Sequence, residues 1–190
     1  MRFDLIDIQD FVQQIVETFA VVIKVDIMIF DLHRNIIAGT GDTKCRVGRQ
    51  FHAGSLTGRV LTDGQLLIAR DPGISAECES CENFSNCNEY DSVIAYPIRI
   101  GSRIMGSFCL VATNDEQKNL ILENEAYLVD FMDKLCGLIG STINEKRFQN
   151  DLTTLIKRYD TVVNNVAEGI IGLDQNGCII HLNGSAENLL

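Results

Sequence analysis

The sequence contains no long apolar run and no basic segment at its amino terminus. No stretch of about twenty consecutive apolar residues occurs, so no part of it is apolar over a sufficient length to cross a membrane as a helix. Residues 1–10 alternate acidic with apolar side chains, whereas a signal peptide begins with basic residues and continues into an unbroken apolar core. These absences favour a cytoplasmic protein.

Positive charge is also scarce. The chain has 16 Lys and Arg against 26 Asp and Glu, for a net charge of −10 and a pI near 4.7. A surface of this sign repels nucleic acids and anionic membranes. We therefore do not expect this segment to read DNA itself, although it could belong to a longer DNA-binding protein.

The remaining composition is that of an ordinary globular protein, with 46% hydrophobic and 22% charged residues. A length of 190 residues accommodates one full domain and part of a second.

The most informative motif is a C-x2-C-x5-C trio formed by Cys78, Cys81 and Cys87. Thiolates two residues apart can converge on one metal ion, and cytoplasmic cysteines are mostly reduced, so we predict a metal or iron–sulfur site. A tetrahedral set needs a fourth ligand. Cys45 is the best candidate, and His52 or a neighbouring acidic residue is an alternative. A disulfide or redox pair, or reduced structural thiols, are the competing interpretations of the trio.

Apolar periodicity predicts an α+β fold in the first 112 residues. The expected helices are 4–22 and 56–62, and the expected strands are 25–30, 35–40, 65–69, 91–100 and 103–112. Ser55 is a suitable N-cap for the second helix and Gly64 a suitable stop. Pro97 within its strand indicates an edge position or a bulge, and Cys109 lies in a strand apolar enough to be core.

Residues 115–160 predict one long helix with the three–four spacing of a coiled coil. The seam residues are Ile121, Leu128, Phe131, Leu135, Leu138, Thr142, Leu152, Ile156, Tyr159 and Val163. We expect the first part to pack partly on its own domain and residues 145–163 to pair with a second chain, which gives a homodimer through the 121–163 helix. Cys136 lies off this seam, and we assign it to the core.

The pattern changes after Tyr159. Residues 162–190 predict the end of a helix, a hairpin turning at Asn176-Gly177 and the start of another helix. About thirty residues cannot close a core of their own, so we expect a fragment of a second domain.

The order of these elements resembles a GAF domain over residues 1–142, an antiparallel sheet with flanking helices. Residues 161–190 resemble the opening of a PAS domain, and a linker helix at 143–160 joins the two. A narrower resemblance is to the sensor half of sigma-54-dependent transcriptional activators of the type found in anaerobic Gram-positive bacteria. The motifs that carry it are Ala38-Gly-Thr-Gly41, Val47-Gly48, Gly54-Ser55, Gly58-x-Val60-Leu61, Asp71-Pro-Gly73, the cysteine trio, Tyr96-Pro-Ile98 and Glu116-Gln117.

This resemblance implies a regulatory segment and not an enzyme. An ATPase domain and a helix-turn-helix domain would follow in the full protein, so contacts with DNA and sigma-54 RNA polymerase would lie outside these residues. The cysteine trio would hold zinc or an iron–sulfur cluster whose state is transmitted through a dimeric helix. Iron bound by thiolates would respond to oxidation, whereas zinc would only clamp the loop.

Two other functions are compatible with the resemblance. GAF domains commonly bind small molecules between the sheet and the loops above it, in which case a metal would only shape the pocket. Some GAF-fold proteins reduce free methionine sulfoxide with loop cysteines, a chemistry that needs a thiolate and a resolving thiol.

Overall fold

A computed structural model describes residues 4–82, 84–87 and 89–189 of the chain. It divides into two compact units, residues 1–144 and 145–190, which we describe separately. Within the described residues, no helix has the length and apolarity needed to span a bilayer.

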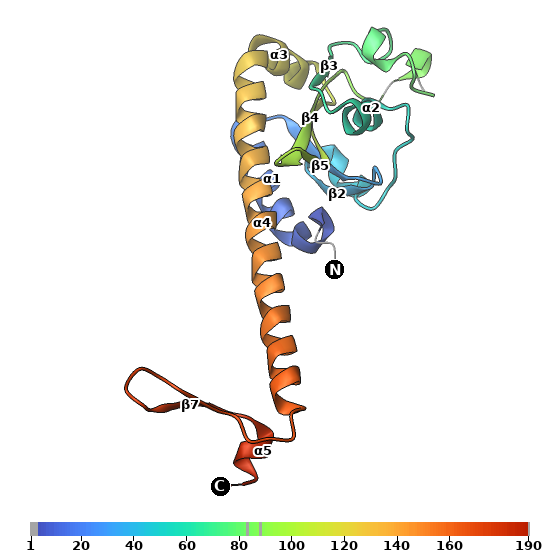
Figure 1. Ribbon diagram of the computed structural model, residues 1–190. Coiled ribbons are helices and arrows are strands. Elements are labelled where there is room, and N and C mark those ends of the chain that lie inside the picture. Colours follow the sequence, from blue (N-terminus) through green and yellow to red (C-terminus); the bar gives the residue numbers. More distant parts are fainter. Residues whose placement is uncertain (1–3, 83, 88, 190) are drawn as a thin grey trace. The chain divides into compact units, whose positions relative to one another are not determined.

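Unit 1 is built on a five-stranded antiparallel sheet (Figure 1). The strand order is β2-β1-β5-β4-β3. The strands are β1 (Asp26–Asp31), β2 (Ile36–Gly39), β3 (Leu67–Ala69), β4 (Ser92–Ile100) and β5 (Arg103–Ala112). All five predicted strands are present, and each consists mainly of apolar residues, as expected of short strands buried in a sheet.

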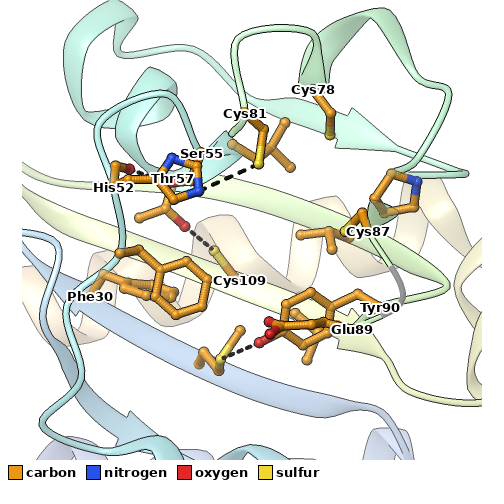
Figure 2. A pocket seen from close by; sticks show the side chains of 16 residues that line it. Phe30, His52, Ser55, Thr57, Cys78, Cys81, Cys87, Glu89, Tyr90 and Cys109 are labelled. Carbon is orange, nitrogen blue, oxygen red and sulfur yellow. Dashed lines mark hydrogen bonds between the residues drawn. The ribbon is translucent and has the colours of Figure 1, made fainter. Parts of the chain in front are cut away.

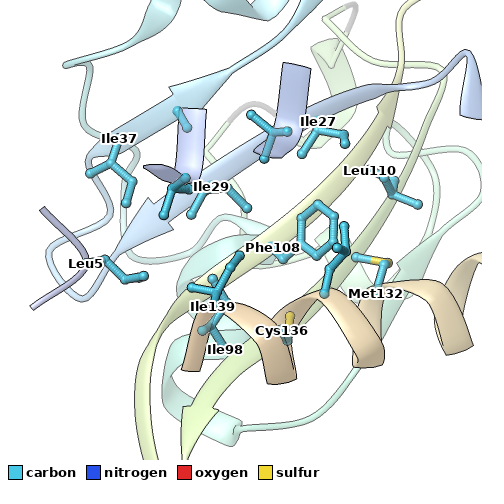
Figure 3. Packing of buried hydrophobic residues seen from close by; sticks show 14 of the residues in the cluster. Leu5, Ile27, Ile29, Ile37, Ile98, Phe108, Leu110, Met132, Cys136 and Ile139 are labelled. Carbon is cyan, nitrogen blue, oxygen red and sulfur yellow. The ribbon is translucent and has the colours of Figure 1, made fainter. Parts of the chain in front are cut away.

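The sheet separates two apolar cores, since successive strand residues point to opposite faces. On β5, Phe108 and Leu110 belong to the first core, which Figure 3 shows packed against a helix. Cys109 and Val111 belong to the second core, on the other face. The alternation in the sequence is thus an alternation between two buried layers.

The first core is covered by helices from both ends of the unit. They are η1 (Leu5–Ile8), α1 (Gln9–Ile23), α3 (Asp115–Glu123) and α4 (Glu125–Asn164). Met132 and Ile139 of α4 are fully buried on the sheet, and burial of each such side chain contributes about 1.5–3 kcal/mol. Cys136 is buried beside them, as predicted.

The prediction of one uninterrupted helix from residue 115 is wrong at Asn124. The backbone N–H and the side-chain amide of Asn124 both donate to the Leu120 carbonyl, at 3.2 and 3.0 Å. An asparagine side chain competes in this way with the helical hydrogen bonds. The result is a break that ends α3 and lets α4 begin in a new direction.

The first part of the predicted seam packs on its own domain, as expected. Ile121, Leu128 and Leu135 are buried in the first core of unit 1 and are not available to a partner. The exposed apolar stripe of α4 lies further along and follows a four–three–four–three spacing. We call it the seam; its residues are Phe148, Leu152, Leu155, Tyr159 and Val162.

Helix α2 (Leu56–Asp63) packs on the second face, opposite α1 and α4. Ser55 Oγ accepts from the Gly58 N–H at 3.2 Å, and Gly64 ends the helix with a left-handed backbone, so both predicted caps are confirmed. Pro97 lies two residues beyond the last β3–β4 pair, at Ala95, and a register shift follows at Ile98. Its strand is an edge at that point, as the proline predicted.

The loops around α2 contain three short 3-10 turns that the sequence did not predict. They are η2 (Gly41–Arg46), η3 (Ala76–Cys78) and η4 (Phe84–Asn86). The last two lie in the segment 70–90, which we call the cysteine loop.

Unit 2 contains the end of α4, a hairpin of β6 (Ile171–Leu173) and β7 (Ile179–Leu182), and α5 (Gly184–Glu187). The predicted hairpin turn is present, with Gly177 left-handed at φ 81°. Asn183 holds the unit together. Its amide nitrogen donates to the carbonyls of Val163 and Glu168 at 3.0 and 2.9 Å, and its side-chain oxygen accepts from the N–H groups of Ile170 and Ala186 at 2.8 and 2.9 Å.

Candidate functional site: a cysteine-lined cavity

A cavity of about 310 Å³ lies on the second face of the sheet. Strands β1, β4 and β5 form its floor, and α2 with the cysteine loop forms its walls (Figure 2). The residues around it are Met28, Phe30, Phe51, His52, Ser55, Leu56, Thr57, Pro72, Cys78, Cys81, Cys87, Glu89, Tyr90, Val93, Cys109 and Val111. A mostly apolar lining with a few polar groups is typical of ligand sites.

The predicted trio meets at this cavity. Cys78 is buried, Cys81 and Cys87 are half-buried, and all three line the same space. All seven cysteines of the chain are free thiols. Among the described residues, however, no three Cys, His, Asp or Glu side chains converge closely enough to hold a metal ion as they stand.

Cys45 does not join the trio. Its side chain is exposed on η2, and its thiol donates to the Asp42 carbonyl at 3.4 Å. It is absent from the residues that line the cavity.

His52 does reach the trio. Its Nε2 lies 3.5 Å from the Sγ of Cys81 (Figure 2). Its Nδ1 is buried and has no hydrogen-bond partner among the residues that the structure describes. The contact joins residues 29 apart in the sequence, which is why cysteine spacing alone could not select this histidine.

Backbone turns and two anchors fix the cysteine loop. The N–H of Cys81 donates to the Cys78 carbonyl at 2.8 Å, and the N–H of Phe84 donates to the Cys81 carbonyl at 3.0 Å. Ser80 Oγ donates to the Gly54 carbonyl at 3.1 Å, and Arg59 donates to the Glu77 carbonyl at 2.7 Å. Helix α2 and the residues before it therefore position the loop.

The far end of the loop is held by Arg46. Its guanidinium donates to Glu89 at 2.7 Å and to the Tyr90 hydroxyl at 2.8 Å. That hydroxyl in turn lies 3.7 Å from the Met28 sulfur. These contacts join η2, the end of the cysteine loop and the sheet beneath the cavity.

Burial keeps several of the acidic groups protonated. Desolvation raises the pKa of the Cys78 thiol to about 11, with a further increase from the charges of Cys81 and Cys87. Desolvation also raises the pKa of Cys109 to about 11 and that of Tyr90 to about 12. Cys78, Cys109 and Tyr90 are therefore neutral near pH 7.

Cys109 is core, as predicted, but it also forms part of the cavity floor. Its sulfur lies 3.4 Å from the Thr57 hydroxyl of α2. The sequence contains a signal for this position: Cys109 directly follows Phe108, so the two side chains point to opposite faces of the strand.

No model of a known protein family matches the chain. The chain is 25% identical over 183 residues to UacR of Escherichia coli strain K12, which is named as a uric acid sigma-54-dependent transcriptional regulator. That match covers 96% of this chain and 30% of UacR, so the chain spans less than a third of its relative. The sequence-based resemblance to sigma-54-dependent regulators is confirmed to this extent.

Solved structures identify the fold. The GAF domain from Acinetobacter phosphoenolpyruvate-protein phosphotransferase superposes with a TM-score of 0.51 at 16% identity, over 78% of this chain and 87% of that domain. The chain contains a GAF fold. A chain of the Escherichia coli DhaR(N)–DhaL complex matches with a TM-score of 0.59 at 13% identity, over 98% of this chain and 63% of that one. The predicted GAF-like α+β architecture is confirmed, whereas the PAS assignment of residues 161–190 and the Gram-positive anaerobe type stay predictions.

The same fold also occurs in an enzyme. The type II free methionine-R-sulfoxide reductase from Thermoplasma acidophilum matches with a TM-score of 0.52 at 13% identity, over 75% of this chain and 96% of that protein. Because identity is this low, the likeness concerns the fold alone, and function has to be argued from the cavity.

Proposed function

We propose that this chain is the sensory segment of a sigma-54-dependent transcriptional regulator and that the cysteine-lined cavity is its input site. The observation that carries this proposal is the meeting of Cys78, Cys81 and Cys87 with His52 at one cavity of a GAF fold. The homology to UacR supports the regulatory class.

The donor set suits a metal centre. Thiolate and imidazole are ligands of zinc, and thiolates also hold iron–sulfur clusters. Residues of the cysteine loop would supply the thiolates. Bound zinc would fix the loop against the sheet, whereas a cluster would add sensitivity to oxidation.

Output would pass through a dimer formed by α4. The seam repeats every three to four residues, the pattern that drives two-stranded coiled coils. Leu155 and Val162 are 61% and 67% exposed in the single chain, and an apolar stripe of this kind is stabilised by a second copy. The net charge of this chain, −10, disfavours contact with nucleic acid. Other parts of the full protein would therefore bind DNA and sigma-54 polymerase, and the protein would act in the cytoplasm.

A second candidate function is the binding of a small molecule. The cavity volume of about 310 Å³ exceeds the space that one ion needs and falls at the lower end for ligand pockets. Phe30, Phe51 and Tyr90 offer aromatic surfaces within it. UacR is named for uric acid, so calorimetry with urate on the metal-free protein is a direct test: heat of binding that is lost on Phe51→Ala would support this candidate.

A thiol reductase is the third candidate, because Cys81 and His52 lie 3.5 Å apart in a fold shared with a methionine sulfoxide reductase. Incubation with free methionine sulfoxide and a thiol reductant decides this question. Absence of turnover would remove the enzyme from consideration.

The main test is the content of zinc, iron and acid-labile sulfide in protein purified without oxygen. We expect bound metal in the unmodified protein and a loss of metal on Cys→Ser substitution at position 78, 81 or 87. Cys→Ser at Cys109 or Cys136 should leave the metal content unchanged. Equal metal in all five variants would contradict the assignment of the trio.

A further inference from the structure

We propose that His52, in place of Cys45, completes a Cys3His site for a single zinc ion with Cys78, Cys81 and Cys87. This inference rests on the proposed metal function and assigns both its metal and its fourth ligand.

The separation of Cys81 and His52 is the first argument. Zinc binds sulfur at about 2.3 Å and imidazole nitrogen at about 2.0–2.1 Å, so two such donors on a tetrahedral ion lie about 3.5 Å apart. The Sγ of Cys81 and the Nε2 of His52 are separated by 3.5 Å. This hydrogen-bond contact thus has the length of one edge of the coordination tetrahedron.

The other two thiols come from the same wall of the cavity. Cys78 precedes Cys81 by one 3-10 turn, and Cys87 follows η4. A change between staggered χ1 rotamers displaces a cysteine sulfur by about 3 Å. Convergence on the Cys81–His52 edge thus needs side-chain rotation and adjustment of the cysteine loop, although no such cluster is formed among the described residues.

His52 is held in place by its backbone. Its carbonyl accepts from both the N–H and the hydroxyl of Ser55, at 3.2 and 2.8 Å, and Ser55 is the N-cap of α2. The imidazole therefore projects from a fixed point beside the cavity, within reach of the cysteine loop.

Cys45 lacks each of these properties. It is exposed, its thiol is directed to Asp42, and it belongs to a different turn from the residues that line the cavity. Cys109 and Glu89 also line the cavity, but the Cys109 sulfur contacts the Thr57 hydroxyl and Glu89 pairs with Arg46. The three cysteines of the trio and His52 remain, and three cysteines with one histidine are an established structural set for zinc.

The test is a zinc titration of the full chain, stripped of metal under reducing conditions, in competition with a chromophoric chelator. The variants are His52→Ala, His52→Cys, Cys45→Ser and, as a matched histidine control, His33→Ala in an exposed turn. We expect one tight zinc in the unmodified protein, in Cys45→Ser and in His33→Ala. His52→Ala should weaken binding by more than the about 10–100-fold that loss of an outer-shell partner costs. His52→Cys should restore it as a four-thiolate site.

The possible outcomes distinguish a failure of the His52 assignment from a failure of the proposed metal-dependent function. If His52→Ala binds zinc as tightly as the unmodified protein, or if Cys45→Ser abolishes binding, the assignment of the fourth ligand is wrong. Iron with labile sulfide in the unmodified protein would overturn the zinc site while keeping a metal-dependent sensor. No affinity for zinc or iron in any variant would overturn the metal function itself. Circular dichroism of His52→Ala, together with the His52→Cys rescue, distinguishes loss of a ligand from misfolding.

Discussion

Ser80 packs its backbone carbonyl against the α-carbon of Gly54, in the place that a β-carbon would occupy, while its hydroxyl donates to the Gly54 carbonyl at 3.1 Å. Gly54 therefore permits the cysteine loop to lie directly on the segment that carries His52. Closely packed contacts of this kind leave no room for an added methyl group.

We expect Gly54→Ala to displace the cysteine loop and to cost about 1–3 kcal/mol of stability, as overpacking does. Limited proteolysis should show faster cleavage within residues 73–90, and urea unfolding should give the stability change. Gly137→Ala is the control for cleavage, because its added β-carbon meets no atom within 4 Å outside its chain neighbours and its own helix backbone; as an alanine inside a helix it should raise stability by about 1 kcal/mol. Unchanged cleavage in Gly54→Ala would show that the contact does not hold the loop.

Stability should fall in alkaline solution in a way that depends on Cys109. Its pKa is raised from 9.0 to about 11 by burial, so between these values the thiol ionises in the unfolded chain and stays protonated in the native one. The unfolded state then binds fewer protons, and the free energy of unfolding decreases as pH rises, by about 1.4 kcal/mol per pH unit for one such group.

Urea titrations between pH 8 and 11 test this point. We expect Cys109→Ala to be less stable near pH 8, because it leaves a cavity, but to lose stability less steeply above pH 9. Val111→Ala removes a buried, non-ionising side chain on the same face and should keep the full slope. Parallel curves for the two variants would contradict the assignment.

The proposed dimer depends on the seam. A Leu side chain contributes about 1.5–3 kcal/mol on burial, and a dimer contains two copies of Leu155. Leu155→Glu should therefore weaken dimerisation by about 10²–10⁴-fold, as measured by sedimentation over a range of concentrations. Thr154→Glu, exposed and off the seam, adds the same charge and should leave the association constant unchanged. A monomeric unmodified protein would remove the dimer from the proposal.

Unit 2 should depend on Asn183, whose side chain makes four hydrogen bonds to backbone groups. Asn183→Ala leaves buried donors and acceptors without partners, which costs about 1–3 kcal/mol per group. We expect faster hydrogen exchange across residues 164–189, detected by mass spectrometry. Asn188→Ala removes an exposed amide that donates to the Gly184 carbonyl and should have little effect. Asn183→Asp keeps the oxygen that accepts from Ile170 and Ala186 but sets a carboxylate oxygen against the carbonyls of Val163 and Glu168, so its exchange should also be faster than in the unmodified protein.

Local patterns account for most of the fold that the sequence predicted. Short apolar runs placed all five strands, and Ser55 and Gly64 placed the ends of α2, because these signals act within a few residues. The break at Asn124 was missed because an asparagine is also tolerated inside a helix, and only its hydrogen bonds to Leu120 reveal the stop.

The candidate site was predictable only in part. The cysteine spacing identified the trio, since all three residues belong to one loop. The approach of His52, and the separation of Cys45 from the cavity, depend on how irregular loops cross the sheet. Such loops carry no periodicity from which their course can be predicted.

The alternation along β5 has a mechanical consequence. Cys109 faces the cavity, whereas Phe108 and Leu110 on either side of it face the helices, at Cα–Cα distances of about 3.8 Å. A peptide unit is planar and stiff, so a strand cannot move on one side only. A displacement of Cys109 by a group that enters the cavity would therefore also move Phe108 and Leu110, which pack in the same core as Met132 of α4. The sheet that separates the two cores is also the shortest covalent connection between them.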